Sequence, residues 1–231
     1  MSTVNDNPSV PTSTTTDYVP DSLIAGGHQV VSDNVTIVSG QGVVARGTLL
    51  GKATLGTASS AAKAGGNTGG GTLTLDVSNP VRANAEQGVY TVRCIAIASN
   101  SGTFEVKDPS GESLGQVVVG ATFDDKIKFV LADVGTDFAL GDGFDVTVAA
   151  GSGKFKVCTA AAIDGTQYPA AIAADTVDAT SADKIVGAYF AGEFNSGAMT
   201  FGAGITAAAV KDALRALSIY LKTALPAADP S

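Results

Sequence analysis

Tryptophan is absent from the chain, histidine occurs once and cysteine twice among 231 residues. A single histidine, His28, cannot build a histidine-based zinc site, and Cys94 and Cys158 lack the close spacing of a metal-binding pair. Cys94 lies inside the strand-like run 89–95, where a thiol serves as a small apolar side chain. We expect two buried free thiols rather than a disulfide, in a reducing compartment, and no metal or other cofactor.

Catalytic motifs are also scarce. No Gly-x-Ser-x-Gly turn is accompanied by a suitable histidine and aspartate, and the glycine-rich stretch 65–71 lacks the Lys-Ser/Thr ending of a phosphate-binding loop. Asp133, Asp137, Asp142 and Asp145 lie close in sequence, but their spacing fits neither an EF-hand loop nor a glycine-rich nonapeptide repeat. Aspartate beside glycine is typical of turns, so we expect turn residues rather than a calcium site. The protein is not expected to be an enzyme, and a hydrolase is the weakest of the hypotheses.

Basic residues are few and scattered. The net charge is −8, with 22 acidic against 14 basic side chains, and no Lys/Arg cluster offsets the repulsion of a polyanion. No uncharged apolar stretch approaches the roughly 18 residues that a membrane helix needs. The first residues carry neither a basic region nor an apolar run, so no signal peptide is expected. These patterns predict a protein made in the cytoplasm that binds neither nucleic acid nor membrane.

The residues that are abundant indicate a β-rich fold. Hydrophobic residues make up 45% of the chain, mostly Ala and Val, and 28 glycines provide many turns. Short β-strands with tight packing suit this composition better than a helical bundle does. We predict a mainly β fold with an α+β core.

Composition also divides the chain into segments. Residues 1–22 are rich in Ser, Thr, Asn and Pro and are expected to form a flexible arm. Residues 59–71 have the composition of a linker, and a second Gly/Ser break lies at 151–153. Between these breaks, residues 72–154 contain five to seven strand patterns separated by Gly/Asp turns, which predicts an inserted β-sandwich-like domain. Residues 23–71 and 155–231 then form the core domain around it.

A single helix is predicted near the C-terminal end. Thr206 can cap it, and Val210, Leu214, Leu217 and Leu221 recur at helical spacing. The prolines that follow should end the helix by about residue 223.

Three motifs in this order resemble the lambda-type bacteriophage head decoration (capsid-stabilising) proteins. They are Val44-Ala45-Arg46-Gly47-Thr48-Leu49-Leu50-Gly51-Lys52, then Ile163-Asp164-Gly165-Thr166-Gln167-Tyr168-Pro169, then Ala191-Gly192-Glu193-Phe194-Asn195 before an amphipathic tail. The resemblance covers residues 17–56 and 158–222 and is interrupted by the insert. It implies a structural virion protein that binds the outer surface of a phage capsid as a homotrimer, with the major capsid protein as its partner, and stabilises the expanded head.

The resemblance also raises an expectation for the N-terminal region. Residues 12–32 pair a polar beginning with a β-prone part, and an extended arm of this kind can add a strand to an exposed sheet edge. The expected capsid-binding residues are Thr16, Asp17, Tyr18, Val19, Leu23, Ile24, Val30 and Val31. The alternative function is a glycan- or host-surface-binding β-module or a phage tail component, and host-surface or glycan contact through the insert is a second expected role.

Overall fold

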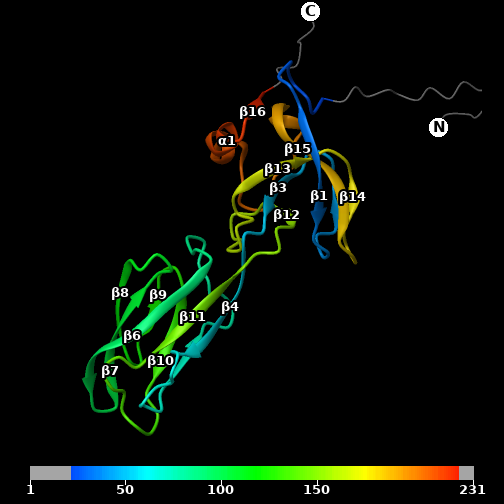
Figure 1. Cartoon of the computed structure of the whole chain (residues 1–231). Helices are drawn as coiled ribbons and strands as arrows, with labels where there is room; N and C mark the ends of the chain where they lie inside the picture. Colours follow the sequence, from blue (N-terminus) through cyan, green and yellow to red (C-terminus); the bar gives the residue numbers. More distant parts are fainter. Residues whose placement is uncertain (1–21, 224–231) are drawn as a thin grey trace, which may run out of the picture.

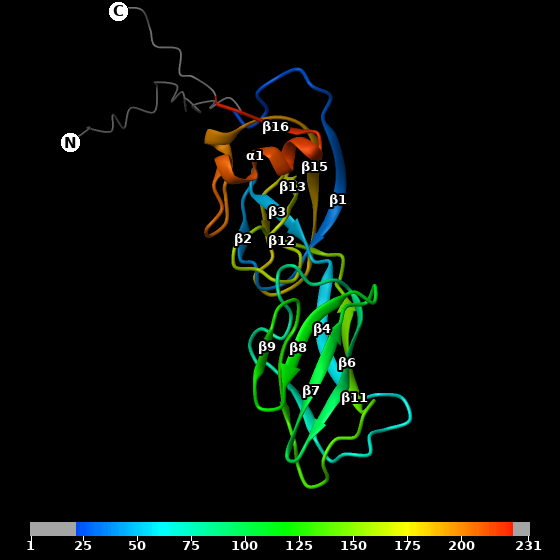
Figure 2. The ribbon, with the colours of Figure 1, turned by 90° about the vertical axis from the view of Figure 1, so that its left-hand side faces the viewer.

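The computed structural model describes residues 22–223, which form two lobes joined by a narrow neck (Figure 1). We call residues 22–54 and 151–223 the body and residues 55–150 the insert. The segment before β1, together with α1 and β16, lies at the end of the body remote from the insert (Figures 1 and 2). Within the described residues, no helix is long and apolar enough to cross a membrane.

The body is built around a closed ring of strands. Its strands are β1 (Val31–Ile37), β2 (Val43–Val44), β3 (Leu49–Lys52), β12 (Phe155–Val157), β13 (Pro169–Ala173), β14 (Val177–Asp178), β15 (Lys184–Asn195) and β16 (Ile219–Lys222). The ring runs β1-β12-β3-β13-β15 and closes because β15 also pairs with β1, while β16 adds to β15 in parallel. Closure leaves the ring strands without open edges, which would otherwise invite unwanted pairing.

Small side chains fill the ring. Ala171, Ala173 and Ala188 are fully buried among larger aliphatic residues such as Ile37 and Leu50. A small barrel leaves little room inside, so the Ala-rich composition fits its interior. The mainly β fold predicted from composition is confirmed.

The helix α1 (Ala207–Ala216) packs its apolar stripe on the body. Its predicted start is confirmed, because the Thr206 hydroxyl accepts a 3.3 Å hydrogen bond from the Ala209 N–H. Its predicted end is wrong. The chain leaves the helix at Leu217, passes through Ser218 at a φ of 62°, and continues as β16, where Ile219 is fully buried. Pairing with β15 outweighs the helical spacing of the leucines, since tertiary contacts routinely override local propensity.

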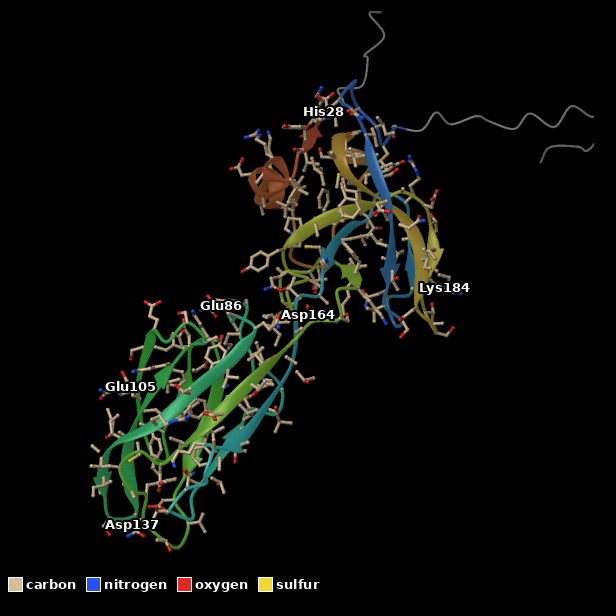
Figure 3. The ribbon with its side chains drawn as sticks, in the orientation of Figure 1. His28, Glu86, Glu105, Asp137, Asp164 and Lys184 are labelled. Atoms are coloured by element: carbon tan, nitrogen blue, oxygen red, sulfur yellow. The ribbon has the colours of Figure 1, made fainter. Side chains whose placement is uncertain are left out.

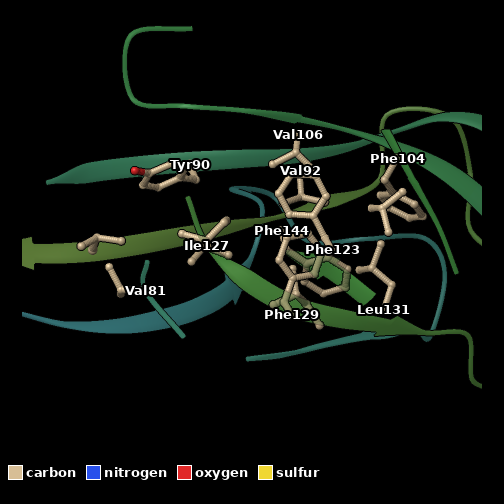
Figure 4. Close-up of a cluster of buried hydrophobic side chains, with 14 of the residues drawn as sticks. Val81, Tyr90, Val92, Phe104, Val106, Phe123, Ile127, Phe129, Leu131 and Phe144 are labelled. Atoms are coloured by element: carbon tan, nitrogen blue, oxygen red, sulfur yellow. The ribbon is translucent and has the colours of Figure 1, made fainter. Parts of the chain in front are cut away.

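The insert is a two-sheet sandwich. One sheet has the order β4 (Leu55–Ala62), β11 (Gly143–Ala150), β6 (Gly88–Ala98), β7 (Ser101–Lys107) and β8 (Ser113–Val118). The other has the order β5 (Thr72–Leu75), β10 (Lys128–Ala132) and β9 (Thr122–Asp124). Alternate side chains of both sheets meet in one core that is richer in phenylalanine than the body (Figure 4). The rings of Phe123 and Phe129 stack at 5.2 Å, and Phe138 meets Phe104 edge-on.

The insert begins earlier than the composition predicts. Residues 59–62, which the sequence assigns to a linker, belong to β4 and pair with β11 along its length. Their Ala/Ser composition has few apolar side chains because β4 is an edge strand whose outer residues are exposed. We therefore place the boundaries of the insert at about 55 and 150 instead of 72 and 154.

Carboxylates tie together the loops at the far end of the insert. Asp142 is 3% exposed and accepts hydrogen bonds from the main-chain N–H groups of Thr68, Gly69 and Ala139. Asp137 accepts from the Asn100 N–H at the end of the insert farthest from the body (Figure 3). Asp145 instead forms an ion pair with Arg93. Three of the four aspartates thus organise loops or strands, and the described residues contain no group of three potential metal ligands.

The two thiols are free and lie in separate cores, Cys94 in the insert and Cys158 in the body. Burial raises the pKa of both, to about 11 for Cys158. They are packing residues, as the sequence indicates.

We predict that the body folds without the insert. The Gly151 N–H donates to the Thr54 carbonyl at 2.9 Å, so a turn of about two residues can join these positions. Replacing residues 55–150 by Asn-Gly should leave a cooperatively unfolding β protein by circular dichroism. Replacing residues 72–154 is the contrasting variant. It leaves β4 without its partner β11 and removes Lys154, whose carbonyl accepts a hydrogen bond from the Ala53 N–H. It should fold poorly. Global unfolding of the first variant would contradict the division into body and insert.

Asp142 should make the insert sensitive to acid. Burial alone would raise its pKa, but the three main-chain N–H groups outweigh this and hold the pKa below its usual range. The stabilisation is therefore complete above the unfolded pKa of about 4 and is lost as pH falls through the lower folded pKa. Asp142→Ala should cost about 3 kcal/mol at neutral pH and flatten the decline in stability below about pH 4. Asp142→Asn keeps one acceptor oxygen, so its stability should lie between that of the natural protein and that of Asp142→Ala. Urea titrations at several pH values would measure this, and equal acid sensitivity of all three proteins would refute it.

Candidate functional site

The candidate site is the end of the body remote from the insert. Residues 22–29, the last residues of β15, β16 and α1 meet there (Figures 1 and 3). We call this surface the tail end, because the chain enters and leaves the described structure on it.

The entering chain is fixed to β15 before β1 begins. The Ala25 N–H donates to the Glu193 carbonyl at 2.9 Å, and the Asn195 N–H donates to the Leu23 carbonyl at 2.8 Å. Ile24 forms an antiparallel bridge with Phe194. The chain is thus already extended and paired where residues 1–21 join it.

Residues 191–195 provide the anchor on the β15 side, and the last four of them have distinct roles. Gly192 adopts a φ of +143° beside the ring of Phe194, a conformation that strains any side chain. Phe194 is fully buried, and the Asn195 side chain accepts from the Gly197 N–H to cap the short helix η1 (Ser196–Ala198). Glu193 forms a 2.9 Å ion pair with Lys222 of β16, which lowers the pKa of its carboxyl group.

The structure describes four of the eight predicted capsid-binding residues. Leu23 is 3% exposed and packs in the body core, so its side chain is not available at the surface. Ile24 is 40% and Val31 47% exposed, whereas Val30 is half-buried. Thr16, Asp17, Tyr18 and Val19 lie outside the described residues.

A basic groove lies between α1 and β16 on the same surface. It consists of two hollows of about 200 and 280 Å³ that share Lys211 and Leu221. Lys211, Arg215 and Lys222 face Glu193 and Asp212, giving a local excess of one positive charge in a protein of net charge −8. If the helix continued through Leu221 as its spacing predicts, all three cations would lie on its polar side. Because Lys222 belongs to β16, they line a groove instead.

The loop before β1 packs against this groove. Gly26 lies so close to Glu193 that an added Cβ would stand 1.5 Å from the carboxylate. The His28 ring lies 5.2 Å from the Tyr220 ring. His28 is exposed, and its ring packs against Tyr220.

The other two motifs meet at the neck. Gly51 of β3 packs directly on the Thr166 main chain, and Pro169 pairs with Gly51. The Asp164 carbonyl accepts from both Thr54 and Leu55, while its carboxylate binds Lys156 at 2.7 Å. Segments more than a hundred residues apart in the sequence therefore form one unit, which holds the two chains that lead into the insert.

Side chains of the second motif also reach across to the insert. Gln167 Nε2 donates to the Ala83 carbonyl at 3.1 Å, and the Tyr168 hydroxyl lies 3.4 Å from the same oxygen. A cavity of about 510 Å³ beside these contacts is lined mainly by apolar residues of both lobes. The neck is held by specific hydrogen bonds between the lobes, whereas the glycine content predicts a pair of flexible linkers.

Comparison with known proteins supports the motif resemblance. The family model described as bacteriophage lambda head decoration protein D matches residues 12–220. A search of curated proteins finds no match. Two crystal structures of FlgL from Xanthomonas campestris, in space groups H3 and C2, are similar at 21% identity and a TM-score of 0.30. They match 46% and 48% of this chain and 33% of the FlgL chain.

The family match extends across both halves of the body and the insert between them. The motifs that carry the resemblance are residues that pair within the ring, anchor the entering chain and hold the neck. The chain belongs to the bacteriophage lambda head decoration protein D family.

Proposed function

We propose that the protein binds the outer surface of a phage capsid through its tail end, as a homotrimer, and stabilises the expanded head. Its partner is the major capsid protein, and it is made in the host cytoplasm before it joins the virion. The observation that carries the proposal is the strand-like pairing of residues 23–25 with β15 at the tail end, next to the proposed capsid-binding residues 16–19 in the sequence. An extended segment in this position can pair with an exposed sheet edge of the shell.

The energetics favour several arms acting together. Tyr18, Val19 and Ile24 supply apolar area, worth roughly 25 cal/mol per Å² when buried, but ordering the arm costs about 1–2 kcal/mol per residue. A single arm therefore binds weakly. Three arms on one trimer raise the effective concentration of each and make attachment firm.

The same geometry directs the insert away from the shell. The insert lies at the opposite end of the molecule from the tail end (Figure 2). Ile97 and Leu140, near its far loops, are 60% and 65% exposed. These exposed aliphatic groups support the second candidate role, contact with a host surface or glycan through the insert, which a glycan array or a host-cell binding assay would test.

Deleting residues 1–21 should abolish capsid attachment and leave the body folded. Leu23 is part of the body core, so a deletion through residue 24 should destabilise the body as well and is not a clean test. Light scattering should give three chains for the full-length and the truncated protein. Cosedimentation with empty expanded capsids should retain only the full-length protein. If the truncated protein binds capsids as well as the full-length protein, the capsid-binding surface lies in the folded body. A stable dimer in light scattering would refute the homotrimer.

The basic groove should contribute to attachment. Lys211→Glu with Arg215→Glu reverses the charge at the tail end, and we expect about tenfold weaker capsid binding. The loss of affinity should be larger at low salt, where charges are less screened. Lys63→Glu with Lys107→Glu makes the same change of net charge on the insert and should have little effect. Equal losses in the two double variants would mean that net charge, not the groove, governs binding.

A further inference from the structure

The loops of the insert nearest the body bring an amine and two carboxylates together. Lys126 Nζ lies 2.9 Å from Asp108 Oδ2 and 3.3 Å from Glu86 Oε1. The Asp108 side chain is 2% exposed and that of Lys126 18%. Glu86 lies at the end of the insert that faces the body (Figure 3).

The environment of Asp108 polarises its carboxyl group. Its other oxygen, Oδ1, accepts from the Ser110 hydroxyl at 2.6 Å and from the main-chain N–H groups of Ser110 and Glu112 at 3.0 Å each. Three donors on one oxygen are the arrangement that stabilises negative charge developing there during attack on the carboxyl carbon. Oδ2, the oxygen beside Lys126, is then the one that leaves.

Glu86 is held where it can move protons. The buried Tyr90 hydroxyl accepts from the Glu86 N–H at 2.8 Å and donates to its carbonyl at 3.1 Å, which fixes the main chain of this residue. Its carboxylate is more than half exposed and contacts Lys126. A nucleophile, a polarised buried carboxyl group beside it and a second carboxylate in contact with the nucleophile meet the geometric requirements for acyl transfer.

We propose that Lys126 and Asp108 form an intramolecular isopeptide bond, with Glu86 as the proton carrier. Glu86 takes a proton from the Lys126 ammonium group, and the freed amine attacks Cγ of Asp108. The C–N bond forms as the carbonyl electron pair moves to Oδ1, and the adduct then collapses and expels Oδ2. Two of the three ammonium protons leave on that oxygen as water, and one stays on the amide nitrogen. The step is redox-neutral and needs no co-reactant.

The starting state is an ion pair. The carboxylate of Asp108 raises the pKa of Lys126, and the Ser110 hydroxyl and Lys126 together hold the pKa of Asp108 well below its usual range. Proton transfer to Glu86 is therefore the demanding part of the reaction. Because the bond forms once in the life of a molecule, the reaction can be slow and still go to completion.

The product would join the two sheets of the insert. Asp108 follows β7 of the larger sheet, and Lys126 precedes β10 of the smaller one. A covalent tie here would fix the loop after β7 to the loop before β10, beside Glu86 at the end of the insert that faces the body.

Intact mass spectrometry of the denatured full-length protein tests the proposal. After incubation at neutral pH, the mass should be lower than the sequence mass by one water. Trypsin should then fail to cleave after Lys126 and should release residues 108–128 as one dehydrated peptide, which separates this bond from dehydration at an Asp-Gly sequence. Lys126→Arg keeps the ion pair but cannot form the amide, so it should have the full mass and should unfold at a lower temperature.

Glu86→Gln isolates the proton carrier. It should fold like the natural protein and form the bond far more slowly. Normal cleavage after Lys126 with the full sequence mass would overturn the isopeptide bond and leave the cluster as an ion pair. Equal rates of bond formation with and without Glu86 would overturn its role.

Discussion

The double pairing of β15 is the constraint on which the body depends. This strand contacts β1 and β13 in its first part, then residues 23–25 and β16 in its last. Its early part closes the barrel, and its later part receives the two segments that lead to the ends of the chain. Gly192 marks the change of partners because it accepts a backbone conformation that other residues resist. Barrel closure and placement of the tail end are thus consequences of a single strand.

The sequence predicts those features that depend on local chemistry. The Thr206 cap, the start of α1 and the β character of the insert follow from capping chemistry, apolar periodicity and turn residues. Features that depend on distant pairing were not predictable. Ile219 to Lys222 continue a helical pattern in sequence and become a strand because the last residues of β15, 192–195, extend beyond the ring and can pair with them. β4 resembles a linker because small and hydroxyl side chains suffice on an exposed edge strand.

The candidate site shows the same division. Ile24 and Val31 can be selected from sequence as β-prone and are exposed, whereas the burial of Leu23 depends on a core formed with Leu49, Phe194 and Leu214. Lys211, Arg215 and Lys222 can be recognised as polar positions in the sequence. That they line one groove depends on Lys222 belonging to β16, which the sequence does not predict. In the insert, Lys126, Asp108 and Glu86 carry no sequence signal, because three turns that are remote in sequence bring them together.

The neck has a consequence for what the body can carry. Two chain segments cross it side by side, linked by the Gly151–Thr54 hydrogen bond and held by Asp164 from the body. We therefore expect that another compact domain whose own ends are adjacent can be joined at this point while the ring of strands is kept. The inserted domain can then be replaced while the body that attaches to the shell is unchanged. The same position would serve to display a foreign protein in many copies on a particle.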